Sequence, residues 1–314
     1  MARKRAVVSE LSERVEEYLT TRRALGFKLA FPGCVLPQFA AYLEAAGAEH
    51  VTTDLAIAWA GLPQGHVLPI SLAHRLGAVR GFARWLKTID PATEVPPCGI
   101  WPSTSPRPTP RIWSKDEIWA LLEAARQLVP ALRGATYEHL FGLLAATGMR
   151  IGEALLLERG DVDLETGVVT VRDGKFGRTR LVPLHPSVTG ALSRYAAQRD
   201  QLCPAPTSST FFVTARGGPL RASPVHDTFN KLATAIGLRD ENTRARIHGL
   251  RHSFVVATLL EWHRAGTDVG SRMAHLSNYL GHLNAEGTYW YFSAVPELMA
   301  LVAARIETGE GASA

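Results

Sequence analysis

Apolar residues recur every three or four positions in four successive runs near the N-terminus, and this periodicity predicts four amphipathic helices. The runs cover residues 9–26, 35–46, a segment that begins after Thr52 and Thr53, and residues 71–87. A glycine closes the first run, and the two threonines are suitable N-caps for the third. We therefore predict a helical N-terminal domain over residues 1–95.

A segment dense in proline follows, from residue 91 to residue 111, and it shows no apolar periodicity. Such a composition is typical of a semi-rigid linker, which we place at residues 96–111. Directly after it, Ser114 and Glu117 are spaced as a helix capping box. A second domain is therefore predicted over residues 112–308, with a tail at residues 309–314.

The second domain is mostly helical in pattern, with one interruption at residues 160–184. There the sequence GDVDLETGVVTVRDGKFGRTRLVPL contains β-branched runs separated by turn residues, which predicts a three-stranded antiparallel sheet. Lys175 lies in the second turn. Helical periodicity then resumes, with Ser223 and Pro224 as a start signal and Gly237 as a stop. The predicted fold class is mainly α with a small antiparallel sheet (α+β).

Composition narrows the choice of partners. The 314 residues carry a formal net charge of +5 and a pI near 9.3, mostly from arginine, which suits a polyanionic ligand. Five basic residues in the predicted helices are candidate phosphate contacts, although a solvated helix face explains each of them nearly as well: Arg22, Arg23, Arg80, Arg84 and Lys87. The N-terminus lacks a signal-like apolar region, and no apolar run is long enough to span a membrane, so we expect a cytoplasmic protein. If its polyanionic partner is DNA, it would be nucleoid-associated.

An arginine and a histidine–arginine pair are the first candidates for phosphate binding. In TGMRIGEALLL, Arg150 lies on the bend between a helix that ends at Gly148 and one that starts at Ile151. A surface arginine near a helix C-terminus is the alternative explanation. In HGLRHSF, His248 and Arg251 share one helical face, where a guanidinium can neutralise a phosphate while an imidazole exchanges a proton with it.

Metal binding is the competing explanation for that histidine segment, because His248 and His252 are spaced four residues apart. No third ligand stands in a zinc-like arrangement, and the HEXXH pattern is absent. The three cysteines are far apart and suggest neither a disulfide framework nor a zinc site. We expect no metal and no cofactor.

Two further groups could take part in acid–base or nucleophilic chemistry. Lys175 would act as a general acid only if its hairpin lies against a substrate. The segment YLGHLNAEGTYWYF places His282 after Gly281, where a helix should end, and offers Tyr289 and Tyr291 as nucleophiles. A phenol titrates near pH ~10 and needs surrounding cations to attack. Residues two apart on a helix point roughly 200° from each other, so only one tyrosine can face a given ligand.

The order of these groups, from arginine through hairpin lysine, HxxR and LGH to tyrosine, resembles the tyrosine recombinases, also called the phage integrase family. The resemblance covers the whole chain and implies a helical SAM-like core-binding domain followed by a catalytic domain. It implies that the scissile phosphate is held by four basic residues: Arg150, His248, Arg251 and His282. Tyr291, nine residues past the last of these, is then the nucleophile.

The resemblance also assigns supporting roles and partners. Lys175 would protonate the leaving group, and Glu153 would orient neighbouring basic side chains. The implied activity is site-specific recombination of double-stranded DNA at inverted-repeat core sites, through a 3′-phosphotyrosine and without ATP or metal. Members assemble as homotetramers or paired dimers on DNA, in some cases with other recombinase subunits. An amphipathic helix near residues 298–306 would pack on its own domain or on a neighbouring subunit.

Three classes of protein remain open at this point. An integrase or the transposase of a mobile element comes first, and YWYFSAVPEL resembles the transposon-borne branch. A type IB topoisomerase shares the catalytic logic but acts as a monomer, whereas the separate helical domain and the short C-terminal helix favour a recombinase. A catalytically silent DNA-binding regulator would lack at least one catalytic group, and none is missing.

Overall fold

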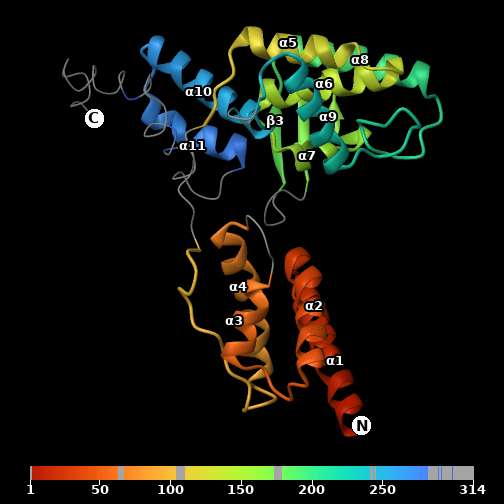
Figure 1. Cartoon of the computed structure of the whole chain (residues 1–314). Helices are drawn as coiled ribbons and strands as arrows, with labels where there is room; N and C mark the ends of the chain where they lie inside the picture. Colours follow the sequence, from red (N-terminus) through yellow and green to blue (C-terminus); the bar gives the residue numbers. More distant parts are fainter. Residues whose placement is uncertain are drawn as a thin grey trace. The chain divides into compact units, whose positions relative to one another are not determined.

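The computed structural model describes residues 2–62, 67–103, 110–172, 179–240, 243, 245–281, 289, 291 and 299. Contacts between Cα atoms divide the chain into two compact units, Met1–Arg107 and Pro108–Ala314. The described residues form eleven α-helices and one three-stranded antiparallel sheet (Figure 1). The predicted fold class is therefore confirmed. No helix formed by these residues is long and apolar enough to cross a membrane.

The first unit is built from four helices, which contact one another around one apolar core. Their bounds are α1 (Ala2–Ala24), α2 (Ala30–Ala46), α3 (Thr53–Gly61) and α4 (Pro69–Leu86). The first helix begins several residues earlier than its apolar pattern indicates. Phe39, Trp59 and Phe82 fill the centre of the core, and the Thr52 hydroxyl caps α3 by accepting a hydrogen bond from the Leu55 N–H.

The beginning of the proline-rich segment packs on this first unit. Val95 and Trp101 lie against its core. The Arg80 guanidinium donates to the carbonyl oxygens of Pro96 and Pro97 at 2.8 and 2.6 Å. These bonds fix a segment that has no secondary structure of its own.

The second unit centres on one buried helix, α6, which is contacted by α5, α8 and α10. Its helices are α5 (Lys115–Arg126), α6 (Ala131–Thr147), α7 (Ile151–Leu155), η1 (Arg159–Asp161), α8 (Pro186–Leu202), α9 (Ala222–Ala235), α10 (His248–Arg264) and α11 (Val269–Leu280). The predicted capping box at the start of α5 is confirmed: Ser114 and Glu117 each accept the other's backbone N–H.

The sheet of the second unit has the order β1 (Val162–Asp163), β2 (Val168–Val171) and β3 (Arg180–Pro183). Both strand pairs are antiparallel, with Val169 opposite Val182 and Val171 opposite Arg180. Since side chains alternate along a strand, Arg180 lies on the same face as the buried Val182. The strand register thus turns this arginine toward the interior of the unit.

Gly148 ends α6 in the left-handed region, with φ of 63°. A Cβ atom there would lie 2.7 Å from Phe254 Cδ1 and 3.1 Å from Leu280 Cδ2. The chain therefore needs glycine at this bend, for its backbone conformation and for the close approach of α10 and α11.

We expect Gly148→Ala to lower the free energy of unfolding by about 1–2 kcal/mol from backbone strain alone, with a further loss from the two contacts. Chemical denaturation measures the effect. Gly152→Ala is the matched control, because Gly152 lies in α7 and an added Cβ would meet nothing within 4 Å. Equal stability of the two variants would contradict the assignment.

Candidate active site

Arg150 occupies the position between two helices that its sequence pattern predicts. It is the N-cap residue of α7, two residues after Gly148, and its side chain remains 28% exposed. The guanidinium donates to the Gly281 carbonyl at 3.0 Å and, at 3.4 Å, to the Leu280 carbonyl, both at the C-terminal end of α11. Arg150 is therefore partly accessible to a ligand, while its bonds to the end of α11 hold the guanidinium in place.

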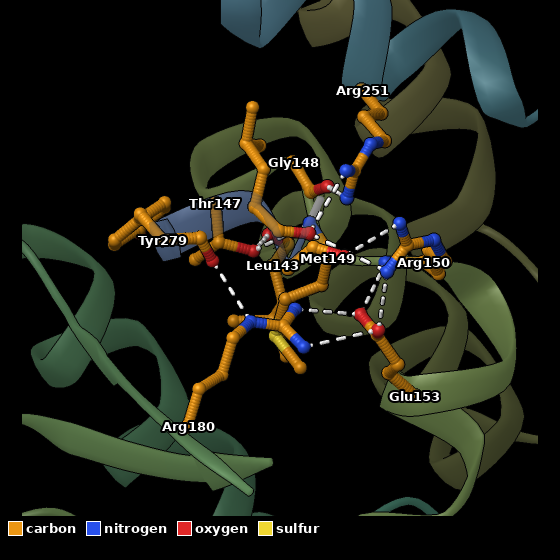
Figure 2. A network of polar contacts seen from close by, with 11 residues as sticks. Leu143, Thr147, Gly148, Met149, Arg150, Glu153, Arg180, Arg251 and Tyr279 are labelled. Carbon is orange, nitrogen blue, oxygen red and sulfur yellow. Dashed lines mark hydrogen bonds and ion pairs between the residues drawn. The ribbon is translucent and has the colours of Figure 1, made fainter. Parts of the chain in front are cut away.

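Arg251 approaches the same helix end from α10. Its guanidinium donates to the Gly148 carbonyl at 2.6 Å and to the Leu280 carbonyl at 2.9 Å, and the residue is 3% exposed (Figure 2). Burial, together with the neighbouring charge of Arg150, lowers the pKa of Arg251 to about 10. It still carries its proton at neutral pH, so two guanidinium charges meet around the end of α11.

Glu153 supplies the negative charge in this cluster, and Figure 2 shows arginines reaching it from two sides. Its carboxylate accepts the Arg150 backbone N–H at 2.9 Å, the Arg150 guanidinium at 2.8 Å, and a fork from Arg180 at 2.8 and 3.1 Å. Burial alone would raise the pKa of Glu153, but the hydrogen bonds from Arg180 and Arg150 hold it below its usual value. The carboxylate stays ionised and fixes both arginines.

His248 begins α10 and shares its face with Arg251, as the spacing predicts. The residue is exposed, yet surrounding protein partly desolvates the ring. This desolvation, with the charges of Arg251 and Arg150, lowers the pKa of His248 below its ordinary value. The His252 ring lies edge-on to it, 4.6 Å between centroids. The two histidines thus lie ring against ring in the first turns of α10, beside Arg251.

Tyr291 lies against the second of these histidines, His252. Its hydroxyl is 2.8 Å from His252 Nδ1, and its ring packs in the apolar cluster between α10 and α11 with 2% exposure. Tyr289, in contrast, is 52% exposed. The two tyrosines thus differ in burial, and Tyr291 contacts the histidine that follows Arg251.

Two of the predicted site residues, Lys175 and His282, lie outside the described residues, as does the predicted C-terminal helix at residues 298–306 apart from Met299. Their neighbours in sequence are placed: Arg172 and Arg180 flank the hairpin, and Gly281 ends α11 with φ of 66°. Within the described part of the chain, no group of three or more potential ligands is arranged to hold a metal ion.

The basic residues of the first unit have different surroundings. Arg23, Arg84 and Lys87 are exposed. The Arg22 guanidinium lies over the Phe27 ring, 3.8 Å from its centroid. Arg80 donates two hydrogen bonds to the proline-rich segment, so it has a structural function in holding that segment.

Two residues of this cluster escape the sequence motifs. The pattern offers His252 only as a metal ligand, although its position directly after Arg251 is a usable signal. No motif singles out Arg180. Side-chain alternation along β3 could have indicated that Arg180 faces inward. Its contact with Glu153 could not be read in that way, because the two residues are 27 positions apart.

The pKa of His252 is lowered to about 4, first by burial and then by the charges of His248 and Arg251. The folded state therefore binds fewer protons than the unfolded state between pH ~6.5 and ~4, so stability falls as the pH drops through this window. At pH ~5 the expected loss from this group is roughly 2 kcal/mol at most, since its partial exposure screens the effect.

Protonation also places hydrogens on both ring nitrogens, so that Nδ1 could no longer accept a hydrogen bond from Tyr291. We expect thermal melts between pH 7 and 5 to fall less steeply for His252→Asn, which places an amide near Nδ1 without a titrating ring. His185→Asn, at the start of α8, is the control. An unchanged slope for His252→Asn would rule out this titration as a source of acid sensitivity.

The sequence matches the phage integrase family over residues 112–297. The "Putative integrase/recombinase y4rB" of Sinorhizobium fredii is 41% identical over 308 residues, covering 96% of this chain and 98% of that protein. The "Tyrosine recombinase XerC" of Pelotomaculum thermopropionicum is 32% identical over 231 residues, covering 70% and 69%. The solved structure of XerH site-specific recombinase bound to difH substrate shares the fold, with a TM-score of 0.62 at 20% identity over 89% of this chain and 81% of that chain.

Proposed function

The chain belongs to the phage integrase family of tyrosine recombinases, and on that premise we propose that it cleaves and rejoins DNA strands at specific sites with Tyr291 as nucleophile. One observation carries the residue assignment. Arg150 from α7 and Arg251 from α10 both bond the carbonyls that end α11, while Tyr291 bonds His252, the neighbour of Arg251 in sequence. Nucleophile and counter-charge are thus linked through two consecutive residues of α10.

The reaction follows from these groups. The phenol oxygen of Tyr291 forms a bond to the scissile phosphorus as its proton passes to solvent water, while the bond from phosphorus to the 5′ oxygen breaks. Negative charge grows on the nonbridging oxygens, and Arg150, Arg251 and His248 are the groups that we propose to stabilise it. Lys175 gives a proton to the leaving 5′ oxygen. The resulting 3′-phosphotyrosine conserves the bond energy, so a 5′ hydroxyl of another strand can reverse the step without ATP.

His252 has a defined part in this scheme. Because burial keeps its ring neutral, Nδ1 can accept the hydrogen bond of the Tyr291 phenol when the ring proton is on Nε2. That bond orients the phenol before the phosphate arrives. A base of such low pKa removes a proton from a phenol poorly, so orientation is the role we assign to it.

Double-stranded DNA with inverted-repeat core sites is the partner that we propose, bound by a homotetramer or paired dimers. The XerH structure, which has the same fold, holds its difH substrate in a pre-cleavage complex. In the first unit, the exposed side chains of Arg23, Arg84 and Lys87 are accessible to phosphates, which gives binding a salt dependence.

Covalent capture from a random library tests the function, because it requires no defined DNA site. The full chain is incubated in EDTA with a library of duplexes that carry a randomised central segment. Detergent stops the reaction, and the DNA that is linked to protein is then extracted. Enriched inverted repeats joined to the protein through a 3′ phosphate are the expected result. Absence of linked DNA, or linkage through a 5′ phosphate, would contradict the proposal. Relaxation of supercoiled plasmid by a monomer would instead indicate a topoisomerase.

A further inference from the structure

Arg180 is a highly connected basic side chain near the site, and the proposed reaction leaves it without a role. It is 13% exposed and donates to three oxygen atoms in two elements: both carboxylate oxygens of Glu153, in α7, and the carbonyl oxygen of Tyr279, in α11. In Figure 2 it faces Glu153 on the side opposite Arg150. Arg180, from β3, therefore links α7 and α11, the two helices whose residues also hold Arg150.

The geometry of Glu153 shows why this tie affects Arg150. Oε1 accepts from Arg150 Nη1 and Arg180 Nη1, and Oε2 accepts from the Arg150 backbone N–H and Arg180 Nη2. Each carboxylate oxygen thus accepts one hydrogen bond from Arg150 and one from Arg180. Rotating the carboxylate toward one partner would lengthen the bonds to the other, so the Arg180 fork fixes the plane in which Arg150 is held.

Arg180 also contacts Gly281, the residue that ends α11. A Cβ atom on Gly281 would lie 2.8 Å from Arg180 Nη1 and 3.0 Å from its Cζ, so the guanidinium lies directly against the backbone there. The carbonyl of the same Gly281 accepts from Arg150. Arg180 supports the end of α11 from one side while Arg150 bonds it from the other, immediately before His282 in sequence.

From these contacts we propose that Arg180 is a positioning residue for strand cleavage. It sets the orientation of the Arg150 guanidinium through Glu153, and it fixes the exit of α11 through Tyr279 and Gly281. Because β3 begins shortly after Lys175 in sequence, the same side chain also anchors the start of that strand to the arginine cluster. The inference rests on the proposed function, since it concerns the rate of the cleavage step.

Single-turnover cleavage of a nicked duplex selected by covalent capture tests the proposal. We expect Arg180→Ala to slow adduct formation about 10- to 100-fold while the dissociation constant for DNA changes less than about threefold. Arg180→Lys should recover little, because an ammonium cannot fork to both carboxylate oxygens. Arg172→Ala is the matched control: it removes an arginine–carboxylate pair at the other base of the hairpin, with Asp161, and should cleave at the wild-type rate.

Two further measurements separate positioning from general destabilisation. Combined with Arg150→Ala, the Arg180→Ala substitution should cost less than it does alone, since one of its two effects acts through the Arg150 guanidinium. On a methylphosphonate duplex, whose scissile phosphate has lost one charged oxygen, the Arg180→Ala deficit should shrink together with that of Arg150→Ala. Thermal melts accompany each variant.

The outcomes are distinct. Near wild-type cleavage by Arg180→Ala, additive losses with Arg150→Ala, or an undiminished deficit on the methylphosphonate would each overturn the positioning role. If Arg180→Ala unfolds, Arg180→Lys decides: full activity in that folded variant would also overturn it. Failure of the wild-type protein to form any adduct would instead refute the proposed function itself.

Discussion

Tyr291→Phe is expected to abolish the covalent protein–DNA adduct, because it removes the oxygen that we propose forms the phosphotyrosine bond. The substitution deletes one hydroxyl from a ring that is otherwise packed in an apolar cluster, so the fold should persist. DNA binding should also persist, since the proposed phosphate contacts do not include the phenol. The measurement is detergent-resistant adduct on the captured duplex, with DNA affinity measured in parallel.

Tyr289→Phe provides the matched control two residues away. It loses the same hydroxyl from an exposed ring and should form adduct at the wild-type rate. Peptide mapping of the wild-type adduct must then place the nucleotide on Tyr291. An adduct that survives Tyr291→Phe, or one that maps to Tyr289, would show that helical phase and spacing identified the wrong tyrosine.

Helix periodicity and helix-end signals predicted the parts of this site that depend on residues within one helical turn of each other. The glycine at position 148 ends α6 in the left-handed conformation and leaves Arg150 on the bend, as its motif indicated. The HxxR spacing placed His248 and Arg251 on one face of α10. Helix ends and faces follow from backbone sterics and the 3.6-residue period, so a single sequence contains this information.

Contacts between distant segments were not predictable in the same way. The bond between His252 and Tyr291 joins residues 39 apart, and it depends on how the chain packs back onto α10 after α11. The sequence showed only a histidine four residues after another, a pattern shared with metal sites. Similarly, the inward turn of Arg180 follows from strand alternation, but its partner Glu153 is fixed only once the sheet packs beside α7.

Arg251→Ala is expected to reduce the single-turnover cleavage rate by about 10²–10³-fold, the usual loss when one preorganised donor to a transition-state charge is removed. The effect should exceed that of Arg180→Ala, because Arg251 would bond the phosphate itself. The substitution also strips hydrogen bonds from the buried carbonyls of Gly148 and Leu280, at about 1–3 kcal/mol each in unfolding free energy. Melts must therefore establish that the variant is folded at the assay temperature.

Arg264→Ala separates the lost donor from the lost charge. It removes one positive charge from the exposed C-terminal end of the same helix, and its cleavage rate should match the wild type. Arg251→Lys tests the geometry of the donor: an ammonium keeps the charge but cannot bond both carbonyls and a phosphate in one plane, so most of the loss should remain. If folded Arg251→Ala cleaved within about tenfold of wild type, the oxyanion role would have to pass to another cation, since removing a true oxyanion donor costs more than that.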